Sequence, residues 1–312
     1  MDTTLNLGES GTLNIDYVLS QRYTETEADP TQSQTFQTRL DGTGGEEFEV
    51  HGSYQLDEGA PLATSDFVPG EQQIELSGTY FYRPEHSVTL SYRFLQDNQS
   101  WDPENPTTTT HNPLVEWDAR IREYTELFFT YEYIRKTNDQ TSKGINKHTH
   151  NVLIGGIQEF LQVPLLKKFV LQAEYHFIDF EDQTDQMADI RTHQVELRGN
   201  TEPVEGLTMS IGQREWFVHE KDLKENTERR DLSTIGVEPT RWERFSAQSQ
   251  YQYQMVYDLV RDEPESKEHS LTVSSQYTLF SVVTSSGKLT RRDKTFFSAG
   301  NKAGQSSSQM LN

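Results

Sequence analysis

The sequence predicts an all-β fold, a transmembrane antiparallel up-and-down β-barrel of about fourteen strands. Three observations predict it. Apolar and polar residues alternate along many short segments, only 33% of the 312 residues are hydrophobic, and short connections alternate with long polar ones. A water-filled barrel needs apolar residues only on its outer wall, whereas a soluble all-β protein of this length must bury a large two-sided core.

The segment ELFFTYEYIRK, at 126–136, shows the alternation most clearly. Its odd-numbered positions are mostly apolar or aromatic and Glu132 falls among the even ones, so an extended chain has two unlike faces. A soluble sheet would bury the aromatic row in a core, and a membrane barrel would turn it to lipid; the segment alone fits both. The pattern recurs at 48–56, 74–82, 87–95, 114–122, 169–177, 245–255 and 271–279.

The connections favour the membrane barrel. Short ones are expected at 41–46, 83–86, 123–126, 161–167, 200–206 and 262–268, and long polar ones at 57–70, 96–111, 137–147, 181–191 and 220–240. Outer-membrane barrels have short periplasmic turns and long extracellular loops. This rhythm divides the chain into an N-terminal periplasmic segment (1–11), a barrel (12–299) and a flexible polar C-terminal tail (300–312). One connection departs from it, because 283–288 is short where a long loop is due.

Composition excludes several classes of function. The net charge of −21 argues against nucleic-acid binding through phosphate contacts. The chain has no cysteine, which excludes disulfides, thiolate metal sites and covalent attachment of c-type haem. No apolar run reaches the roughly 18 residues of a membrane helix. The N-terminus lacks the features of a signal peptide, so an exported protein is expected to have lost it.

No catalytic or cofactor motif is found, and we predict that the protein is not an enzyme and holds no cofactor or metal. His148 and His150 lie on one side of a strand, but two ligands do not make a metal site. The acidic stretch 179–189 lacks the glycine and the oxygen spacing of a calcium loop.

Alternation assigns side chains to the two faces of the wall. Charged residues that alternate with apolar ones are predicted to line the pore: Arg93, Glu116, Asp118, Arg120, Arg122, Glu132, Glu174, His176, Glu196, Arg198 and Arg214. The opposite rows are predicted to face lipid, including Leu90, Tyr92, Trp117, Phe129, Tyr131, Leu171 and Tyr175.

On this pattern the chain resembles bacterial outer-membrane β-barrel proteins as a class, over nearly its full length and without a short family motif. Its size is similar to that of fourteen-stranded monomeric porins. Its acidic, Gln- and Tyr-rich texture is similar to that of barrels in porin–cytochrome conduits. The resemblance implies a passive outer-membrane pore for small hydrophilic solutes or ions. The alternative is a structural barrel that sheathes or anchors a partner, such as a multihaem cytochrome or a secretion component.

The expected partners are outer-membrane lipid and, in the alternative, a periplasmic or lumenal protein. One departure concerns the C-terminus. The resemblance implies a final strand with a terminal aromatic residue, and the nearest candidates, Phe296 and Phe297, lie well before the end of the chain.

Overall fold

A computed structural model describes most of the chain: residues 2–6, 11–24, 31–61, 68–97, 107–138, 144–161, 163, 168–184, 187–239, 245–279, 283–298 and 301–311. It divides into two compact units. Unit 1 comprises residues 1–119, 128–152 and 179–189, and unit 2 comprises residues 120–127, 153–178 and 190–312. The described residues form β-strands and their connections.

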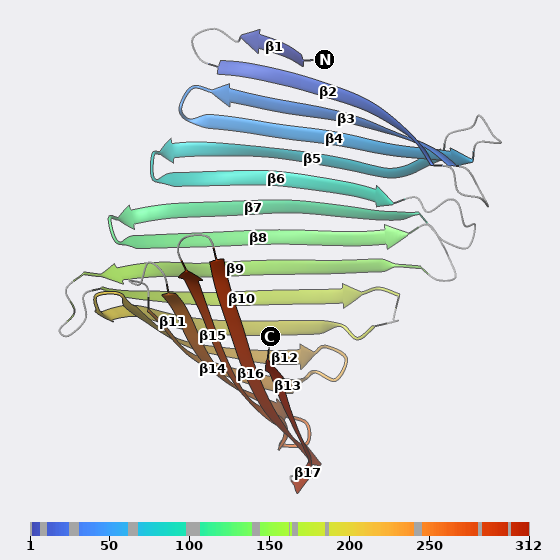
Figure 1. The fold of residues 1–312 in the computed structure, drawn as a ribbon. Coiled ribbons are helices and arrows are strands. Elements are labelled where there is room, and N and C mark those ends of the chain that lie inside the picture. The colour runs from blue at the N-terminus through green and yellow to red at the C-terminus, as the bar shows by residue number, and fades with distance from the viewer. Residues whose placement is uncertain are drawn as a thin grey trace. The chain divides into compact units, whose positions relative to one another are not determined.

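Unit 1 begins with six strands that follow one another along the chain (Figure 1). They are β1 (Asp2–Asn6), β2 (Gly11–Thr24), β3 (Thr31–Gly44), β4 (Phe48–Pro61), β5 (Val68–Arg83) and β6 (His86–Asp97). Four further strands are shared between the units: β7 (Thr108–Arg122), β8 (Thr125–Asn138), β9 (Asn146–Phe160) and β10 (Phe169–Asp182).

Unit 2 continues with β11 (Ile190–Val204), β12 (Leu207–Glu220), β13 (Glu225–Pro239), β14 (Phe245–Asp258), β15 (Glu263–Leu279), β16 (Val283–Ser298) and β17 (Asn301–Leu311). The described residues therefore hold seventeen strands, against the fourteen or so expected. The predicted all-β, antiparallel, up-and-down organisation is confirmed.

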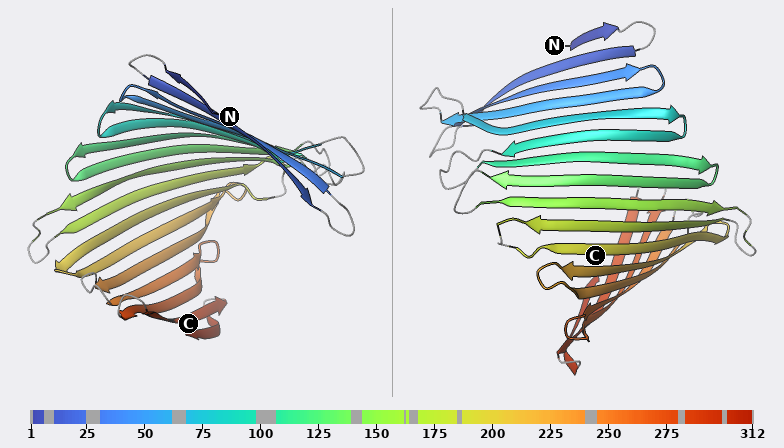
Figure 2. Two further views of the ribbon diagram at one scale, coloured as in Figure 1. Left: turned by 45° about the horizontal axis from the view of Figure 1, so that its top comes forward. Right: turned by 180° about the vertical axis from the view of Figure 1, so that it is seen from behind.

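Each strand from β1 to β6 pairs antiparallel with the next, and so does each strand from β11 to β16. The two views of Figure 2 show β2–β6 of unit 1 side by side in chain order. A strand that pairs with its sequence neighbour puts its backbone hydrogen bonds into one local ladder, which satisfies the polar backbone groups within the sheet. Directly opposed residues share a face of the sheet.

The short connections carry turn chemistry. The turn after β3 places Gly45 at φ 71°, and the turn after β11 places Gly206 at φ 83°. Such φ values cost glycine least, because it has no Cβ. The described connections at 84–85, 123–124 and 205–206 are as short as the sequence predicted.

The expected long connection at 220–240 is a strand hairpin instead. Residues 221–224 turn, and β13 pairs with β12 from Glu225 to Pro239. The sequence ENTERRDLSTIGVEP hides this strand because its first half is polar on both faces. Because of this extra strand, β14 and each later strand run in the direction opposite to the one expected from the sequence. The short connection expected at 262–268 is the turn 259–262, which lies at the same end of unit 2 as the turn 221–224. With the extra strand, a short connection near 283 no longer departs from the expected alternation of short and long connections.

The two ends of the chain also differ from expectation. The segment 1–11 includes β1, which pairs with β2 from Asp2 to Asn6. Residues 301–311, expected as a flexible tail, form β17 on β16. Their sequence, NKAGQSSSQML, has no apolar alternation, so backbone pairing rather than side-chain pattern decides this strand.

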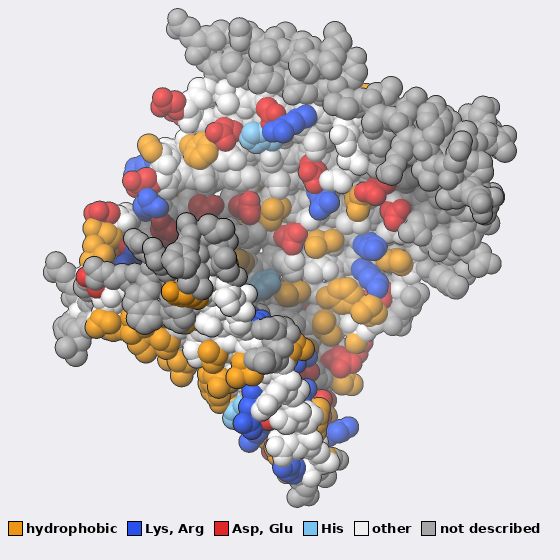
Figure 3. All heavy atoms as spheres, viewed as in Figure 1, with side chains coloured by type: hydrophobic (Ala, Val, Ile, Leu, Met, Phe, Trp, Pro, Cys, Tyr) orange, Lys and Arg blue, Asp and Glu red, His pale blue; other side chains and the backbone are white. Residues whose placement is uncertain are grey.

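The described residues have almost no apolar core. Ala119, 3% exposed, is the one buried hydrophobic residue among them, while many large apolar side chains are open to the surroundings. Acidic and basic side chains lie interspersed on the surface of unit 1 seen in Figure 3. In the described part of the chain, no helix has the length and apolar character needed to cross a bilayer.

Candidate pore lining

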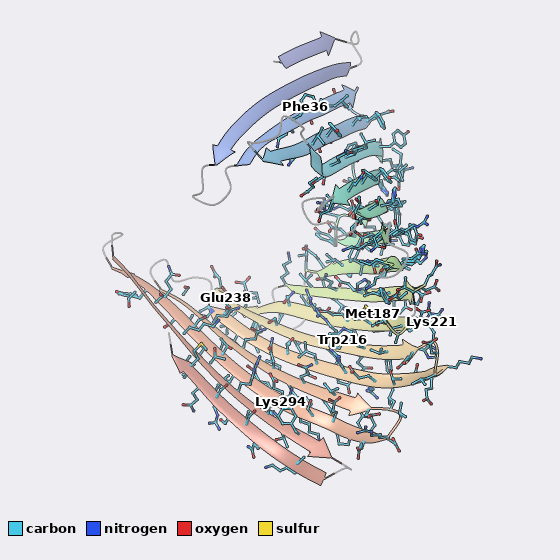
Figure 4. The ribbon with its side chains drawn as sticks, turned by 90° about the vertical axis from the view of Figure 1, so that its right-hand side faces the viewer. Phe36, Met187, Trp216, Lys221, Glu238 and Lys294 are labelled. Atoms are coloured by element: carbon cyan, nitrogen blue, oxygen red, sulfur yellow. The ribbon has the colours of Figure 1, made fainter. Side chains whose placement is uncertain are left out.

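The sheet has two unlike faces, and side chains stand on both of them (Figure 4). We call the face that carries Arg93, Glu116, Glu132, Glu196 and Arg214 the charged face, and the face that carries Leu90, Tyr92, Trp117, Tyr131 and Tyr175 the apolar face. Cross-strand register keeps each set together. Arg93 lies opposite Glu75 on β5, and Glu196 lies opposite Arg214, whereas Leu90 lies opposite Val115.

An ionic cluster occupies the charged face of β3–β6. Arg39 Nε lies 2.7 Å from Asp41 Oδ2, and His51 Nδ1 lies 2.7 Å from Asp41 Oδ1. One register step along, Arg93 Nε lies 3.2 Å from Glu75 Oε1. These side chains, with Asn112, line an open cavity of about 590 Å³. Nothing in the sequence indicated that His51 would meet Asp41 or that Glu75 would meet Arg93.

Glu132 sits farther along the same face between two amides. Asn112 Nδ2 donates to Glu132 Oε1 at 2.9 Å, and Asn151 Nδ2 donates to Glu132 Oε2 at 2.7 Å. Both carboxylate oxygens are therefore bound by neutral donors from β7 and β9, and the charge of Glu132 stays uncompensated by these partners. The two asparagines were not singled out from the sequence, because an amide on a polar face has no distinctive pattern.

Unit 2 has an arginine clamp, formed by Glu196, Arg198 and Arg214. Arg198 and Arg214 both donate through Nε to Glu196, one to each carboxylate oxygen, and the Arg214 contact is 2.5 Å. The Glu196 side chain is only 7% exposed, while Arg214 is 29% and Arg198 44% exposed. Two cations on one shielded carboxylate leave a local positive excess.

The clamp is supported from both sides. Arg214 Cζ lies 5.4 Å from the centre of the Trp216 ring, a cation–π contact that fixes the guanidinium. Gln250 and Gln252 of β14 join the clamp around a cavity of about 270 Å³. Sequence alternation predicted all three members of the clamp, and the register of β11 with β12 brings them together.

The other predicted pore-lining residues are spread along the charged face. Glu116 and Asp118 lie opposite Thr89 and Ser87 of β6. Arg120 Nη2 binds Glu126 Oε1 at 2.5 Å, and Arg122 is exposed beside the 123–124 turn. Gln172 donates to Glu174, with which His176 alternates on β10. Their pore-lining role stays a prediction.

The predicted lipid-facing residues form the apolar face. Leu90 is 58% exposed, Leu171 37%, and Tyr92 and Tyr175 are each 36% exposed, while Trp117 and Phe129 are half-buried. Trp117 Nε1 donates to the Tyr82 hydroxyl at 3.2 Å. Their contact with lipid likewise stays a prediction.

The apolar face is interrupted on β12 and β13. Glu215 lies opposite Val195 on one side and Asp231 on the other. Arg229 bridges these two acids, with its Nε 3.0 Å from Asp231 and its Nη2 3.7 Å from Glu215. This neutralisation reduces the cost of placing charge on an apolar surface. Sequence patterning did not indicate this bridge, because β13 was expected to be a loop.

The histidine pair considered as a metal site has other partners. His148 Nδ1 lies 2.6 Å from the Tyr133 hydroxyl, and His150 Nδ1 lies 2.9 Å from the Tyr131 hydroxyl. Among the residues that the structure describes, no group of three or more His, Asp or Glu side chains is arranged to hold a metal ion.

Neither the known protein families nor the curated protein sequences include a match to this chain. Solved structures do share its fold. The siderophore receptor PirA from Pseudomonas aeruginosa is 12% identical, with a TM-score of 0.64 over 96% of this chain and 60% of the receptor. PirA from Acinetobacter baumannii is 8% identical, with a TM-score of 0.60 over 98% of this chain and 58% of the receptor.

The FrpB iron transporter from Neisseria meningitidis (F3-3 variant) is 11% identical, with a TM-score of 0.59 over 99% of this chain and 64% of the transporter. The chain thus spans less than two thirds of the length of these proteins. At such low identity the likeness shows the fold alone. It is the fold of bacterial outer-membrane β-barrels, and it confirms the resemblance predicted from the sequence.

Proposed function

We propose that the chain forms a passive, water-filled pore for small hydrophilic solutes or ions in the bacterial outer membrane. The observation that carries the proposal is the contrast between the two faces of one sheet. Large apolar side chains of one face are exposed, whereas the charges of the other face bind one another around open cavities. Lipid against the apolar face and water against the charged face satisfy both.

Paired charges suit a pore wall better than a tight binding site. Arg93 with Glu75 and Arg39 with Asp41 are half or more exposed on their arginine side, so water screens them and each pair contributes little to stability. Such residues create a field across the lumen without closing it. We assign no catalytic role to them, because the sequence has no nucleophile or metal motif.

A sheath around a protein partner is the alternative. The solved relatives are named as siderophore receptors and an iron transporter, and their substrates do not pass to this chain with the fold. Conductance of the protein alone separates the two proposals. An open pore conducts by itself, whereas a sheath without its partner is not expected to conduct.

The experiment reconstitutes the protein into a planar bilayer after heat-modifiable migration on a gel has shown that it is folded. We expect discrete, stable conductance steps. Folded protein that stays silent would overturn the pore and favour the sheath. As an internal control, Arg93→Gln should change the step size while leaving heat-modifiable migration unchanged, because Arg93 is more than half exposed on the charged face.

A further inference from the structure

A short motif occurs four times on the apolar face. It consists of a tyrosine, any residue, a second aromatic ring and a histidine 18 or 19 positions after the tyrosine. The copies are Tyr92, Phe94 and His111; Tyr131, Tyr133 and His150; Tyr175, Phe177 and His193; and Tyr251, Tyr253 and His269. Each copy places its tyrosine on one strand and its histidine on the next strand of the chain.

The four copies have the same geometry. The tyrosine hydroxyl lies 2.7, 2.9, 2.7 and 2.7 Å from histidine Nδ1, in chain order. The imidazole also packs on the second aromatic ring, with centroids 5.2, 4.8, 5.1 and 4.9 Å apart. Register explains the repetition, since aromatic residues two positions apart on a strand form a slot for a ring from the next strand.

Three of the four copies lie where the apolar rows end. On β6, β8 and β10 the next residue of the same row is Gln96, Arg135 or Asp179. Each tyrosine is six residues after the start of its strand, or about 20 Å along it, and the second ring is two residues farther. For strands tilted by about 40°, the second rings stand about 20 Å above the strand starts, in the upper part of a lipid-facing band of about 25 Å.

Two of the histidines, His111 and His150, retain a second nitrogen for another partner. If the tyrosine hydroxyl donates to Nδ1, that atom is the acceptor and the ring proton lies on Nε2. Nε2 of His111 and of His150 has no hydrogen-bond partner among the residues that the structure describes, whereas His269 has Asp293 opposite it on β16. In that tautomer, His111 and His150 offer N–H donors at the ends of these rows.

We propose that the two pairs of unit 1, Tyr92 with His111 and Tyr131 with His150, which we call the Tyr–His belt, bind the phosphate groups of lipid headgroups where the apolar rows of β6 and β8 end. The proposal rests on the outward orientation of the apolar face in the proposed pore. The aromatic rings anchor the belt at the boundary of hydrocarbon and headgroups, and the Nε2–H groups donate to phosphate oxygens. Because a neutral imidazole already donates, the phosphate need not be paired with a charged histidine.

The experiment measures relative lipid association in vesicles by electron paramagnetic resonance, with spin-labelled phosphatidylglycerol, phosphatidylcholine and digalactosyldiacylglycerol. We expect both phosphate-bearing lipids to be favoured over the galactolipid in the native protein. In the double variant His111→Phe, His150→Phe the preference should fall about two- to tenfold, the range of a net hydrogen bond, because the rings stay and their nitrogens are lost.

Two variants sharpen the result. Tyr92→Phe with Tyr131→Phe keeps every ring but removes the hydroxyls that set the tautomer, and should weaken the preference less. His176→Phe alters a histidine inside the third copy that belongs to the charged face, and should leave lipid preference unchanged.

A preference that follows charge alone, or one that the double variant retains, would overturn the belt as a phosphate site. Conductance and heat-modifiable migration are measured on the same preparations. Native protein that conducts but shows no preference for the phosphate-bearing lipids therefore refutes the belt and not the pore, whereas silent folded protein counts against the pore.

Discussion

Leu90→Arg should lower the stability of the protein folded in lipid, whereas Ser91→Arg should leave that stability nearly unchanged. Leu90 is 58% exposed and lies between Gly78 and Val115 on the apolar face. Full burial of a leucine contributes about 1.5–3 kcal/mol, so lipid covering the exposed part contributes about 0.9–1.7 kcal/mol. Adding a guanidinium near mid-wall brings the expected total for Leu90→Arg to about 2–4 kcal/mol. Ser91 lines the cavity on the charged face, where an added arginine meets water.

The assay measures equilibrium folding into lipid vesicles over a range of urea concentrations, with the folded fraction determined from heat-modifiable migration on a gel. We expect the folding equilibrium constant of Leu90→Arg to fall about 30- to 700-fold relative to native protein, and that of Ser91→Arg to change little. If Leu90 faced water, both substitutions would stay within about 0.5 kcal/mol of native protein. Equal stability of the two variants would therefore refute the assignment of lipid to the apolar face.

The remaining predictions concern topology and selectivity. Protease added to intact cells should cut at 98–107 and spare the 84–85 and 123–124 turns, and cleavage at those turns alone would invert the topology. Glu132→Gln should change single-channel conductance more than selectivity, because the net charge falls only from −21 to about −20 while one of the two asparagines must turn its amide to accept from the new side chain; a reversal-potential shift without a conductance change would contradict this. The net charge of −21 should give a mild cation preference at low salt, which weakens as the Debye length falls to about 3 Å at 1 M salt. Glu196→Gln should reduce this cation preference, because it leaves the charges of Arg198 and Arg214 without their carboxylate partner. Anion preference of the native pore at all salt concentrations would refute the expected cation preference.

The candidate site was predicted as a set of residues and not as a set of contacts. Alternation identified Glu196, Arg198 and Arg214 because each alternates with residues of the opposite face within its own strand. It could not identify the two asparagines that bind Glu132, since an amide on a polar face has no distinctive neighbours. The Tyr–His belt was missed for a related reason: its tyrosines were predicted only to face lipid, and His150 was considered only with His148 as a metal pair.

The fold shows the same division. Strands such as β6 and β8 were predicted because apolar and polar side chains alternate along them, and a period of two is visible in a few residues. β13 and β17 were not predicted. Arg229 and Asp231 break the period on β13, and the residues of β17 are polar on both faces, so each strand depends on the backbone donors and acceptors offered by its neighbour.

The sequence by itself determined which residues of a strand share a face, because that depends only on the geometry of an extended chain. The tertiary structure decided which residues of different strands meet, because cross-strand register joins positions far apart in sequence. Glu196 finds Arg214 across 18 positions, and Tyr131 finds His150 across 19. A shift of one residue would move either partner to the opposite face, so the clamp and the belt exist only in the register that the folded sheet selects.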